Sequence, residues 1–250
     1  MRVVFLCGEG TANDFVYTFI LENYDLVGVI VDEPQSKYKL VKRRIKKLGY
    51  IKVFSQLLFM TLVVPFLKME SSKRCRDIID KHKLQKAQNF PSIYCPGSIN
   101  NPLVIEKLNE LEPELVIVHG TRIIAKKILK EISIPILNIH SGITPQYRGV
   151  HGGYWALVNK DHSNFGVTVH RVDSGIDTGA ILEQGNVTIN VKDNFCSYPL
   201  LQITKGVEIL DLAIKTLDIE RKDKETSSSK LYYHPGILEY LFYRFRYGVK

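Results

Sequence analysis

Short runs built almost entirely from apolar residues are the feature that most limits how this chain can fold. Such runs lack the alternation of a half-buried strand and are typical of parallel strands covered on both faces of a sheet. Helical patterns over 15–23 and 104–111 stand between them. This alternation predicts a doubly wound α/β fold with a mostly parallel sheet. The four clearest runs cover residues 2–7, 26–31, 115–119 and 136–140.

The pattern continues in the same way towards the end of the chain. We expect one domain over 1–219, interrupted by an insertion at about 37–76 and followed by a short C-terminal extension over 220–250. The further predicted strands cover 166–172 and 180–189, and the further predicted helices cover 125–132, 151–158 and 197–217.

Length and composition place the chain among ordinary globular proteins. Its 250 residues suffice for one large α/β domain, and a composition of 45% hydrophobic and 24% charged residues excludes a largely disordered chain. The four cysteines form no C-x-x-C pair, so neither a zinc site nor a disulfide framework is predicted. Scattered cysteines and a start without a cleavable signal favour a cytoplasmic protein with no bound metal.

A formal net charge of +8 favours anionic partners. A phosphorylated substrate, a nucleic acid and an acidic membrane surface all satisfy this charge, and so does a solvated basic surface with no partner. The net charge therefore predicts that a partner is negatively charged and leaves the class of partner open.

The segment 37–76 differs from the rest of the chain. A basic run over 37–52 precedes an apolar stretch over 53–67 that is shorter than a typical membrane-spanning helix. This composition is that of an interfacial anchor, so 50–68 is expected to contact the inner face of a membrane or to mediate self-association. Alternatively, its apolar residues pack on the α/β core and its lysines are solvated. In the membrane interpretation, the residues entering the acyl boundary are Phe54, Leu57, Leu58, Phe59 and Leu62, extended by the aromatic residues of 240–247.

A turn-rich stretch follows the first apolar run. Gly8 and Gly10 match half of a dinucleotide-binding fingerprint, but the position of its third glycine holds Asn13. A tight turn is the better interpretation. Backbone N–H groups at the start of the following helix are nevertheless placed to bind an anion such as a substrate phosphate.

Asn138 and His140 carry the most informative chemistry. Residues two apart on a strand face the same side, so both project together near the carboxyl end of a parallel strand, where open α/β sheets place their ligands. An Asn amide and an imidazole N–H are suitable donors to the oxyanion that forms when an amine attacks an acyl carbon. A carboxylate such as Asp177 can orient the imidazole, raise its pKa and help to remove the proton from the amine.

Taken alone, these three residues also fit a structural role, because a buried histidine is more often structural and aspartate is favoured in Gly-rich turns. Five motifs that occur in order along the chain favour the catalytic role over the structural one. They resemble the motifs of the folate-dependent formyltransferases, a family that includes methionyl-tRNA, glycinamide ribonucleotide and sugar N-formyltransferases. The resemblance is strong over 104–189 and weaker over 1–35. The motifs are Asn138-x-His140, Pro145-x-Tyr-Arg-Gly149, Trp155-Ala156, Gly166-Val-Thr168 and Asp173-x-Gly-x-Asp-Thr-Gly179.

This resemblance implies a Rossmann-like formyltransferase fold over 1–219. It implies Asn138, His140 and Asp177 as the catalytic set, and 10-formyltetrahydrofolate as the donor. We expect the folate and the acceptor amine to contact neighbouring sets of residues. The folate set is Gly120, Thr121, Arg122, Ile123, Ile124, Ser141 and Asp173, and the acceptor set is Gly8, Gly10, Tyr147 and Arg148.

The acceptor is open among several classes. The chain departs from the common His-Pro-Ser-Leu-Leu-Pro pattern with His140-Ser-Gly-Ile-Thr-Pro145. It ends before the C-terminal barrel domain of methionyl-tRNA formyltransferases, and Tyr147-Arg148-Gly149 resembles the tRNA and sugar branches more than the purine branch. We therefore expect a nucleotide-linked amino sugar and no nucleic acid. The alternatives are glycinamide ribonucleotide formylation, hydrolysis of formyl-folate, and a non-catalytic folate- or nucleotide-binding protein.

Overall fold

A seven-stranded sheet with the order β3-β2-β1-β4-β5-β7-β8 forms the centre of the computed structural model, which describes residues 1–85, 93–217 and 229–250. The strands β1 to β5 are parallel, whereas β7 runs antiparallel to both β5 and β8. The mostly parallel α/β sheet expected from the apolar runs is therefore confirmed. The strands are β1 (Arg2–Cys7), β2 (Asp25–Val31), β3 (Ile93–Tyr94), β4 (Leu115–His119), β5 (Ile136–His140), β7 (Gly166–Arg171) and β8 (Ile181–Asn186).

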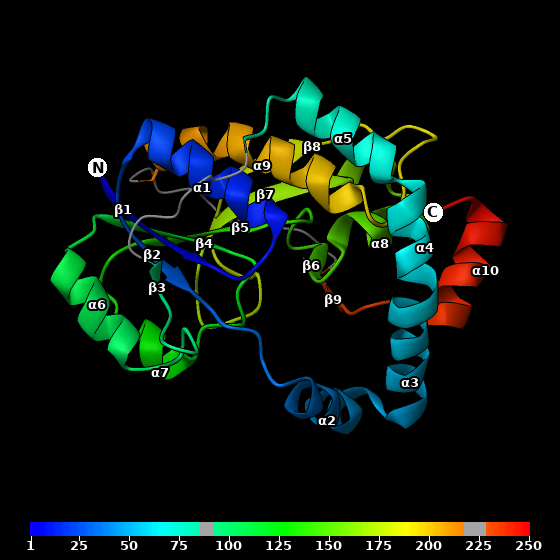
Figure 1. The fold of residues 1–250 in the computed structure, drawn as a ribbon, viewed down its shortest axis with the longest axis horizontal. Helices are drawn as coiled ribbons and strands as arrows, with labels where there is room; N and C mark the ends of the chain where they lie inside the picture. Colours follow the sequence, from blue (N-terminus) through cyan, green and yellow to red (C-terminus); the bar gives the residue numbers. More distant parts are fainter. Residues whose placement is uncertain (86–92, 218–228) are drawn as a thin grey trace.

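Helices cover both faces of this sheet (Figure 1). In β1, Phe5 faces the helices α1 (Thr11–Asn23) and α9 (Tyr198–Lys215), whereas Leu6 faces α6 (Leu103–Leu111) and α7 (Lys126–Leu129). Successive strand residues point to opposite faces, so an unbroken apolar run supplies side chains to both cores. This double coverage explains why the strands lack polar alternation.

Two predicted elements are shorter by four residues in the structure. The helix expected over 125–132 is helical only at Lys126–Leu129, because the chain continues with i→i−3 hydrogen bonds from Glu131 and Ile132. The strand expected over 180–189 ends at Asn186. Both differences lie at element ends, which are the least specified part of a sequence pattern.

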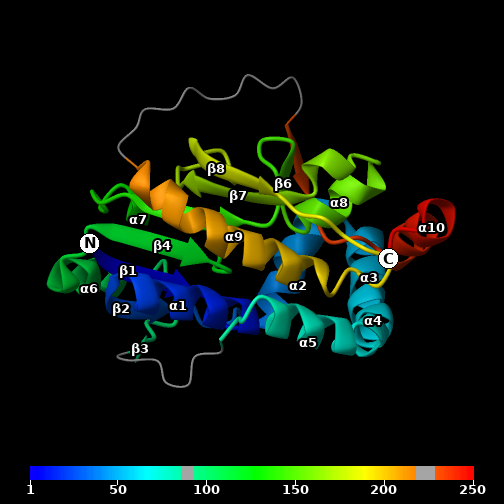
Figure 2. The same ribbon diagram turned by 90° about the horizontal axis from the view of Figure 1, so that it is seen from above.

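The insertion forms a helical arm beside the sheet (Figure 2). Its continuous part, Tyr50–Glu70, has 21 residues and is long and apolar enough to cross a membrane by length and composition alone. One side of this arm packs on the body, because Phe59 is fully buried against Phe195 and Tyr240. The arm consists of α2 (Lys37–Leu48), α3 (Tyr50–Leu58), a π-helical turn (Phe59–Val63), α4 (Val64–Glu70) and α5 (Ser72–Lys81).

The C-terminal segment packs on the same region. Its strand β9 (Lys230–Tyr232) pairs in parallel with β6 (Tyr147–Gly149), and its helix α10 (Ile237–Tyr247) lies beside α3 (Figure 2). The indole of Trp155, on α8 (Gly152–Val158), donates a hydrogen bond of 2.9 Å to the carbonyl of Tyr233. The extension thus contacts the loop that follows β5. The expected boundary between residues 219 and 220 lies outside the described residues.

Phe59 and Phe54 provide a matched test of how the arm is attached. Phe59→Ala removes a fully buried ring between the arm, Phe195 and α10, so we expect the free energy of unfolding to fall by about 3 to 5 kcal/mol. Phe54 lies on the same arm but is 64% exposed, so Phe54→Ala should change the free energy of unfolding by no more than about 0.5 kcal/mol. Urea unfolding followed by circular dichroism measures both, and equal losses would mean that the arm does not pack as described.

Candidate active site

Strand β5 places Asn138 and His140 on the same side of the sheet, near its carboxyl edge. Asn138 is half-buried and His140 is buried. The antiparallel strand β7 sets His170 opposite Asn138 and Thr168 opposite His140. The Thr168 hydroxyl donates a hydrogen bond of 2.8 Å to the carbonyl of Gly142 and thereby holds the loop that follows His140.

Asp177 reaches this pair from the loop after β7. Its backbone has a positive φ of 51°, a conformation that aspartate tolerates better than most residues. Its carboxylate lies 3.5 Å from Nδ1 of His140 and 3.7 Å from Nε2 of His170, and it accepts a hydrogen bond of 2.8 Å from the N–H of Gly149. The three residues expected to be catalytic therefore lie together, with Asp177 between two histidines.

The hydrogen bond at Nε2 determines the tautomer of His140. Nε2 lies 2.8 Å from the backbone carbonyl of Tyr147, which can only accept, so Nε2 carries the proton of the neutral ring. A side chain at Gly142 would place its Cβ 2.5 Å from this carbonyl and 2.8 Å from Nε2, so only glycine permits the contact. Nδ1 consequently keeps its lone pair and faces Asp177.

His170 is a member of the site that the sequence analysis did not identify. Its Nδ1 lies 2.8 Å from the carbonyl of Arg171, so Nδ1 carries the proton and Nε2 accepts. The amide nitrogen of Asn138 donates to this Nε2 over 3.1 Å, which orients the Asn138 amide and leaves its second N–H unused. The available signal was its spacing: His170 follows Thr168 by two positions on a predicted strand and shares its face.

Burial and charge shift the pKa values of this cluster in opposite directions. Burial lowers the pKa of His140 below its ordinary 6.5, although the neighbouring Asp177 carboxylate raises it in part. Burial opposes ionisation of Asp177, but its contacts with the His170 and His140 rings and with the Gly149 N–H outweigh it and hold the pKa of Asp177 at about 2. At neutral pH the site thus pairs an ionised carboxylate with a neutral imidazole.

A pocket of about 110 Å³ adjoins Asn138 and Asp177. It contains most of the expected folate residues, with Ile124 buried and Ile123 61% exposed at the surface. Gly120 and Ser141 of the expected folate set do not line it. The residues that do are Val118, Thr121, Arg122, Ile123, Ile124, Asn138, His170, Val172, Asp173, Gly175, Ile176 and Asp177.

Two polar residues of the expected folate set already have protein partners. The guanidinium of Arg122 forms an ion pair of 2.7 Å with buried Asp32, which joins the ends of β2 and β4. The carboxylate of Asp173 accepts hydrogen bonds of 2.8 Å from the Thr178 hydroxyl and 3.0 Å from the Gly175 N–H. Both residues therefore shape the pocket walls.

The expected acceptor residues are divided between two places. Gly8 is buried at the end of β1, where a Cβ would lie 2.3 Å from the carbonyl of Gly120, whereas Gly10 is exposed at the start of α1. The side chain of Tyr147 is buried and donates to Asp161, so it reaches the site through its carbonyl only. Arg148 donates a hydrogen bond of 3.1 Å to the carbonyl of Ile176, next to Asp177.

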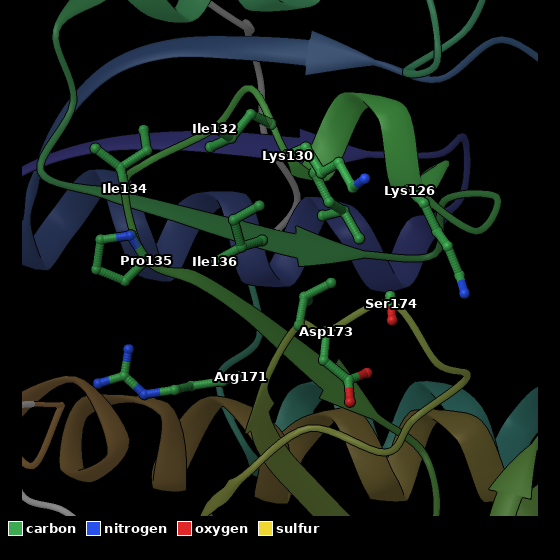
Figure 3. Close-up of a pocket in the computed structure, with 11 residues that line it drawn as sticks. Lys126, Lys130, Ile132, Ile134, Pro135, Ile136, Arg171, Asp173 and Ser174 are labelled. Atoms are coloured by element: carbon green, nitrogen blue, oxygen red, sulfur yellow. The ribbon is translucent and has the colours of Figure 1, made fainter.

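A larger cavity of about 560 Å³ lies outside this cluster (Figure 3). Lys126 of α7 and Lys130, just after its end, line it together with Asp173 and Ser174 of the loop after β7 (Figure 3). None of Asn138, His140 and Asp177 lines this cavity. The candidate active site is therefore the cluster of these three residues, although the pocket beside it is smaller. Within residues 1–85, 93–217 and 229–250, no three His, Cys, Asp or Glu residues are grouped to hold a metal ion.

Comparison with known proteins gives one family. The family model described as formyl transferase matches residues 65–198. The methionyl-tRNA formyltransferase of Campylobacter jejuni is 31% identical over 147 residues, which are 58% of this chain and 48% of that protein. The chain thus spans about half the length of the curated relatives it matches.

Solved structures support the same fold. A sugar N-formyltransferase from a Shewanella species aligns with a TM-score of 0.52 and 17% identity, over 92% of this chain and 75% of that one. The phosphoribosylglycinamide formyltransferase of Anaplasma phagocytophilum aligns with a TM-score of 0.57 and 17% identity, over 92% and 94%. At these identities the likeness concerns the fold.

The protonation of His140 is directly measurable. We expect the neutral Nε2–H tautomer at pH 7 and a pKa below 6.5, because burial disfavours the charged ring. Asp177→Asn removes the charge that raises this pKa, so the pKa should fall further, while His119, whose pKa burial lowers to about 4, should not follow. Nitrogen-15 NMR of histidine-labelled protein reports tautomer and pKa. A His140 that titrates above 6.5 contradicts the assignment.

Proposed function

Because the chain belongs to the formyl transferase family, we propose that it transfers a formyl group from 10-formyltetrahydrofolate to the amine of a small acceptor. The observation that carries this proposal is the cluster of Asn138, His140 and Asp177 at the carboxyl edge of the sheet, with its 3.5 Å contact between imidazole and carboxylate. An amide donor, a neutral imidazole and an ionised carboxylate are the groups that acyl transfer to an amine requires.

Asn138 is proposed to stabilise the oxyanion. One N–H of its amide is held by His170, and this contact fixes the direction of the second N–H without using it. A donor that is oriented before the reaction needs no reorganisation when charge develops on the carbonyl oxygen. His170 acts here as a positioning residue.

His140 is proposed to carry the proton. As the amine forms its new bond to the formyl carbon, Nδ1 of neutral His140 accepts the proton that the amine loses. The resulting imidazolium is stabilised by Asp177 at Nδ1 and by the Tyr147 carbonyl at Nε2. Its Nδ1–H can donate to the oxyanion and then return the proton to the nitrogen that leaves the formyl carbon.

The folate pocket fits the donor in chemical character. Buried Ile124 and the neighbouring Val172 supply apolar walls for a flat ring, and the backbone of 121–124 supplies polar groups for its edges. Ile123 is apolar and 61% exposed beside this pocket, and a bound folate would cover it. When bound, the donor supplies a formyl carbon on a nitrogen that leaves with a proton.

A nucleotide-linked amino sugar is the proposed acceptor. Nε of Arg148 is buried and has no hydrogen-bond partner among the described residues, so a cation next to the site is left for an anionic ligand. Arg44 of α2 lies near His151 and His234; burial and this cation together lower the pKa of His234 to about 4. One structural neighbour is a sugar N-formyltransferase.

Glycinamide ribonucleotide is the second candidate acceptor. Exposed Gly10 lies at the start of α1, where a phosphate can bind.

Substitutions in the cluster test the catalytic assignment. We expect His140→Ala, Asp177→Asn and Asn138→Ala to fold normally and to lose about a hundred- to thousandfold in transfer rate, because each removes a group that acts on the reacting atoms. His162→Ala, at an exposed histidine on the turn before β7, is the matched control and should keep full activity. Mass spectrometry of the formylated acceptor gives the rates. Near-normal turnover by a folded His140→Ala protein refutes the role of this residue.

The acceptor class is tested by competition between amines. In a mixture of nucleoside-diphosphate-linked amino sugars and glycinamide ribonucleotide, we expect formylation of an amino sugar, with a KM that rises at least about tenfold in Arg148→Gln because an anion loses a charged partner. Efficient formylation of glycinamide ribonucleotide alone would contradict the sugar assignment, and formate release without any formylated amine would indicate a hydrolase.

A further inference from the structure

An exposed apolar strip runs along the arm from residue 50 to residue 69. Six large apolar side chains on it are more than half exposed, which is unusual for one continuous face of a protein with a buried core. Only 28% of the most apolar 18-residue window of this helix is buried. The six are Tyr50, Ile51, Phe54, Leu62, Phe66 and Met69.

The π-helical turn keeps this strip on one side of the arm. Phe59 and Val64 are five positions apart and both buried, a spacing that a regular α-helix would place on different faces. With the π turn between them, both point to the body, and Leu62 and Phe66 continue the exposed side that Phe54 begins. The arm thus has one packed side and one apolar side in solvent.

The strip lies in a strongly basic part of the chain. Residues 34–69 contain nine Lys or Arg and no Asp or Glu. Seven of the nine belong to α2, which is joined to α3 by Gly49. Val41 and Ile45 of α2 line an apolar crevice of about 450 Å³ with Tyr50, Ile51, Val53, Phe54 and Leu57 of α3. Apolar and basic side chains are therefore carried by the same two helices, which follow one another in Figure 1.

We propose that α2 and the strip over 50–69 form a docking surface for an anionic lipid bilayer, with the arm lying flat in the headgroup region. The apolar side chains enter the acyl boundary, and the exposed Lys and Arg side chains of α2, which exclude Arg44, contact anionic headgroups. Phe54 and Leu62 belong to this surface, whereas the expectation that Phe59 enters the membrane is wrong, because Phe59 is fully buried in the protein.

Contacts on the packed side exclude a membrane-spanning position for the arm. Gln56 donates a hydrogen bond of 2.6 Å to the carbonyl of His234, and Lys52 pairs with Glu239 of α10. Asn194 donates a hydrogen bond of 3.0 Å to the carbonyl of Leu67. A spanning helix would break these contacts and carry Lys52 and Gln56 into hydrocarbon.

Charge also favours a bilayer over a second copy of the chain. A symmetric dimer through this surface would place the same patch of each copy face to face. The six exposed cations of α2 would then meet six like charges, with no acidic residue over 34–69 to pair with them. An anionic bilayer supplies the opposite charge and an apolar interior together.

Vesicle co-sedimentation of the full chain tests this proposal. The probes are vesicles of phosphatidylcholine alone and vesicles in which about a third of the lipid is phosphatidylglycerol. The wild-type protein should bind the anionic vesicles at low salt and detach as salt rises, because exposed charges are screened. Phe54→Glu with Leu62→Glu, and separately Lys42→Gln with Lys46→Gln, should weaken binding by at least about tenfold.

Leu212→Glu is the matched control, since Leu212 is 51% exposed on α9, outside α2 and the strip over 50–69. It should bind vesicles like the wild type. All variants change exposed side chains, and circular dichroism checks that they fold. The proposal is overturned if the folded wild type ignores anionic vesicles, or if the Phe54/Leu62 variant binds them equally well. A lipid-free dimer that this variant dissociates, seen by analytical ultracentrifugation, would assign the strip to a second copy. Lipid binding is measured without turnover, so this result is independent of the proposed function.

Discussion

The carboxylate of Asp177 is the contact on which the candidate site depends. It lies within 3.7 Å of two histidines on adjacent strands and accepts the N–H of Gly149. The loop after β7, the strand pair β5–β7 and the loop after β5 therefore meet at one largely buried charge, since the Asp177 side chain is 15% exposed. Burying a charge is costly unless it is paired and hydrogen-bonded, so these three segments must keep their relative positions.

The insertion and the C-terminal extension, which lie outside the common α/β pattern, stabilise the loop that follows β5. The Tyr147 carbonyl fixes the His140 tautomer, and β6, which contains Tyr147, is paired with β9 of the C-terminal segment. That segment is held by Trp155 and by α10 against the arm, where Phe59 and Tyr240 are in contact. The insertion and the extension thus form a third core that backs the active-site loop.

The sequence predicted the strands and the catalytic candidates because both follow local rules. Apolar runs identify buried strands, and the spacing of Asn138 and His140 places them on one face. His170 was not identified because its role depends on the antiparallel register of β5 and β7, which no local pattern encodes. Phe59 was misplaced because its apolar character alone does not show which side of the helix packs on the body. That side is determined by contacts with Phe195 and Tyr240, which are distant in the sequence.

The central claim is that His140 and Asp177 act as one unit on the transferred proton. The most direct measurement compares the formyl transfer rate of the His140→Ala/Asp177→Asn double variant with those of the two single variants. Residues that act as a unit give strongly non-additive losses, so we predict a double variant no slower than about threefold below the slower single variant. If the rate of the double variant falls by the product of the two single-variant losses, the claim is contradicted, because the two residues would then act independently.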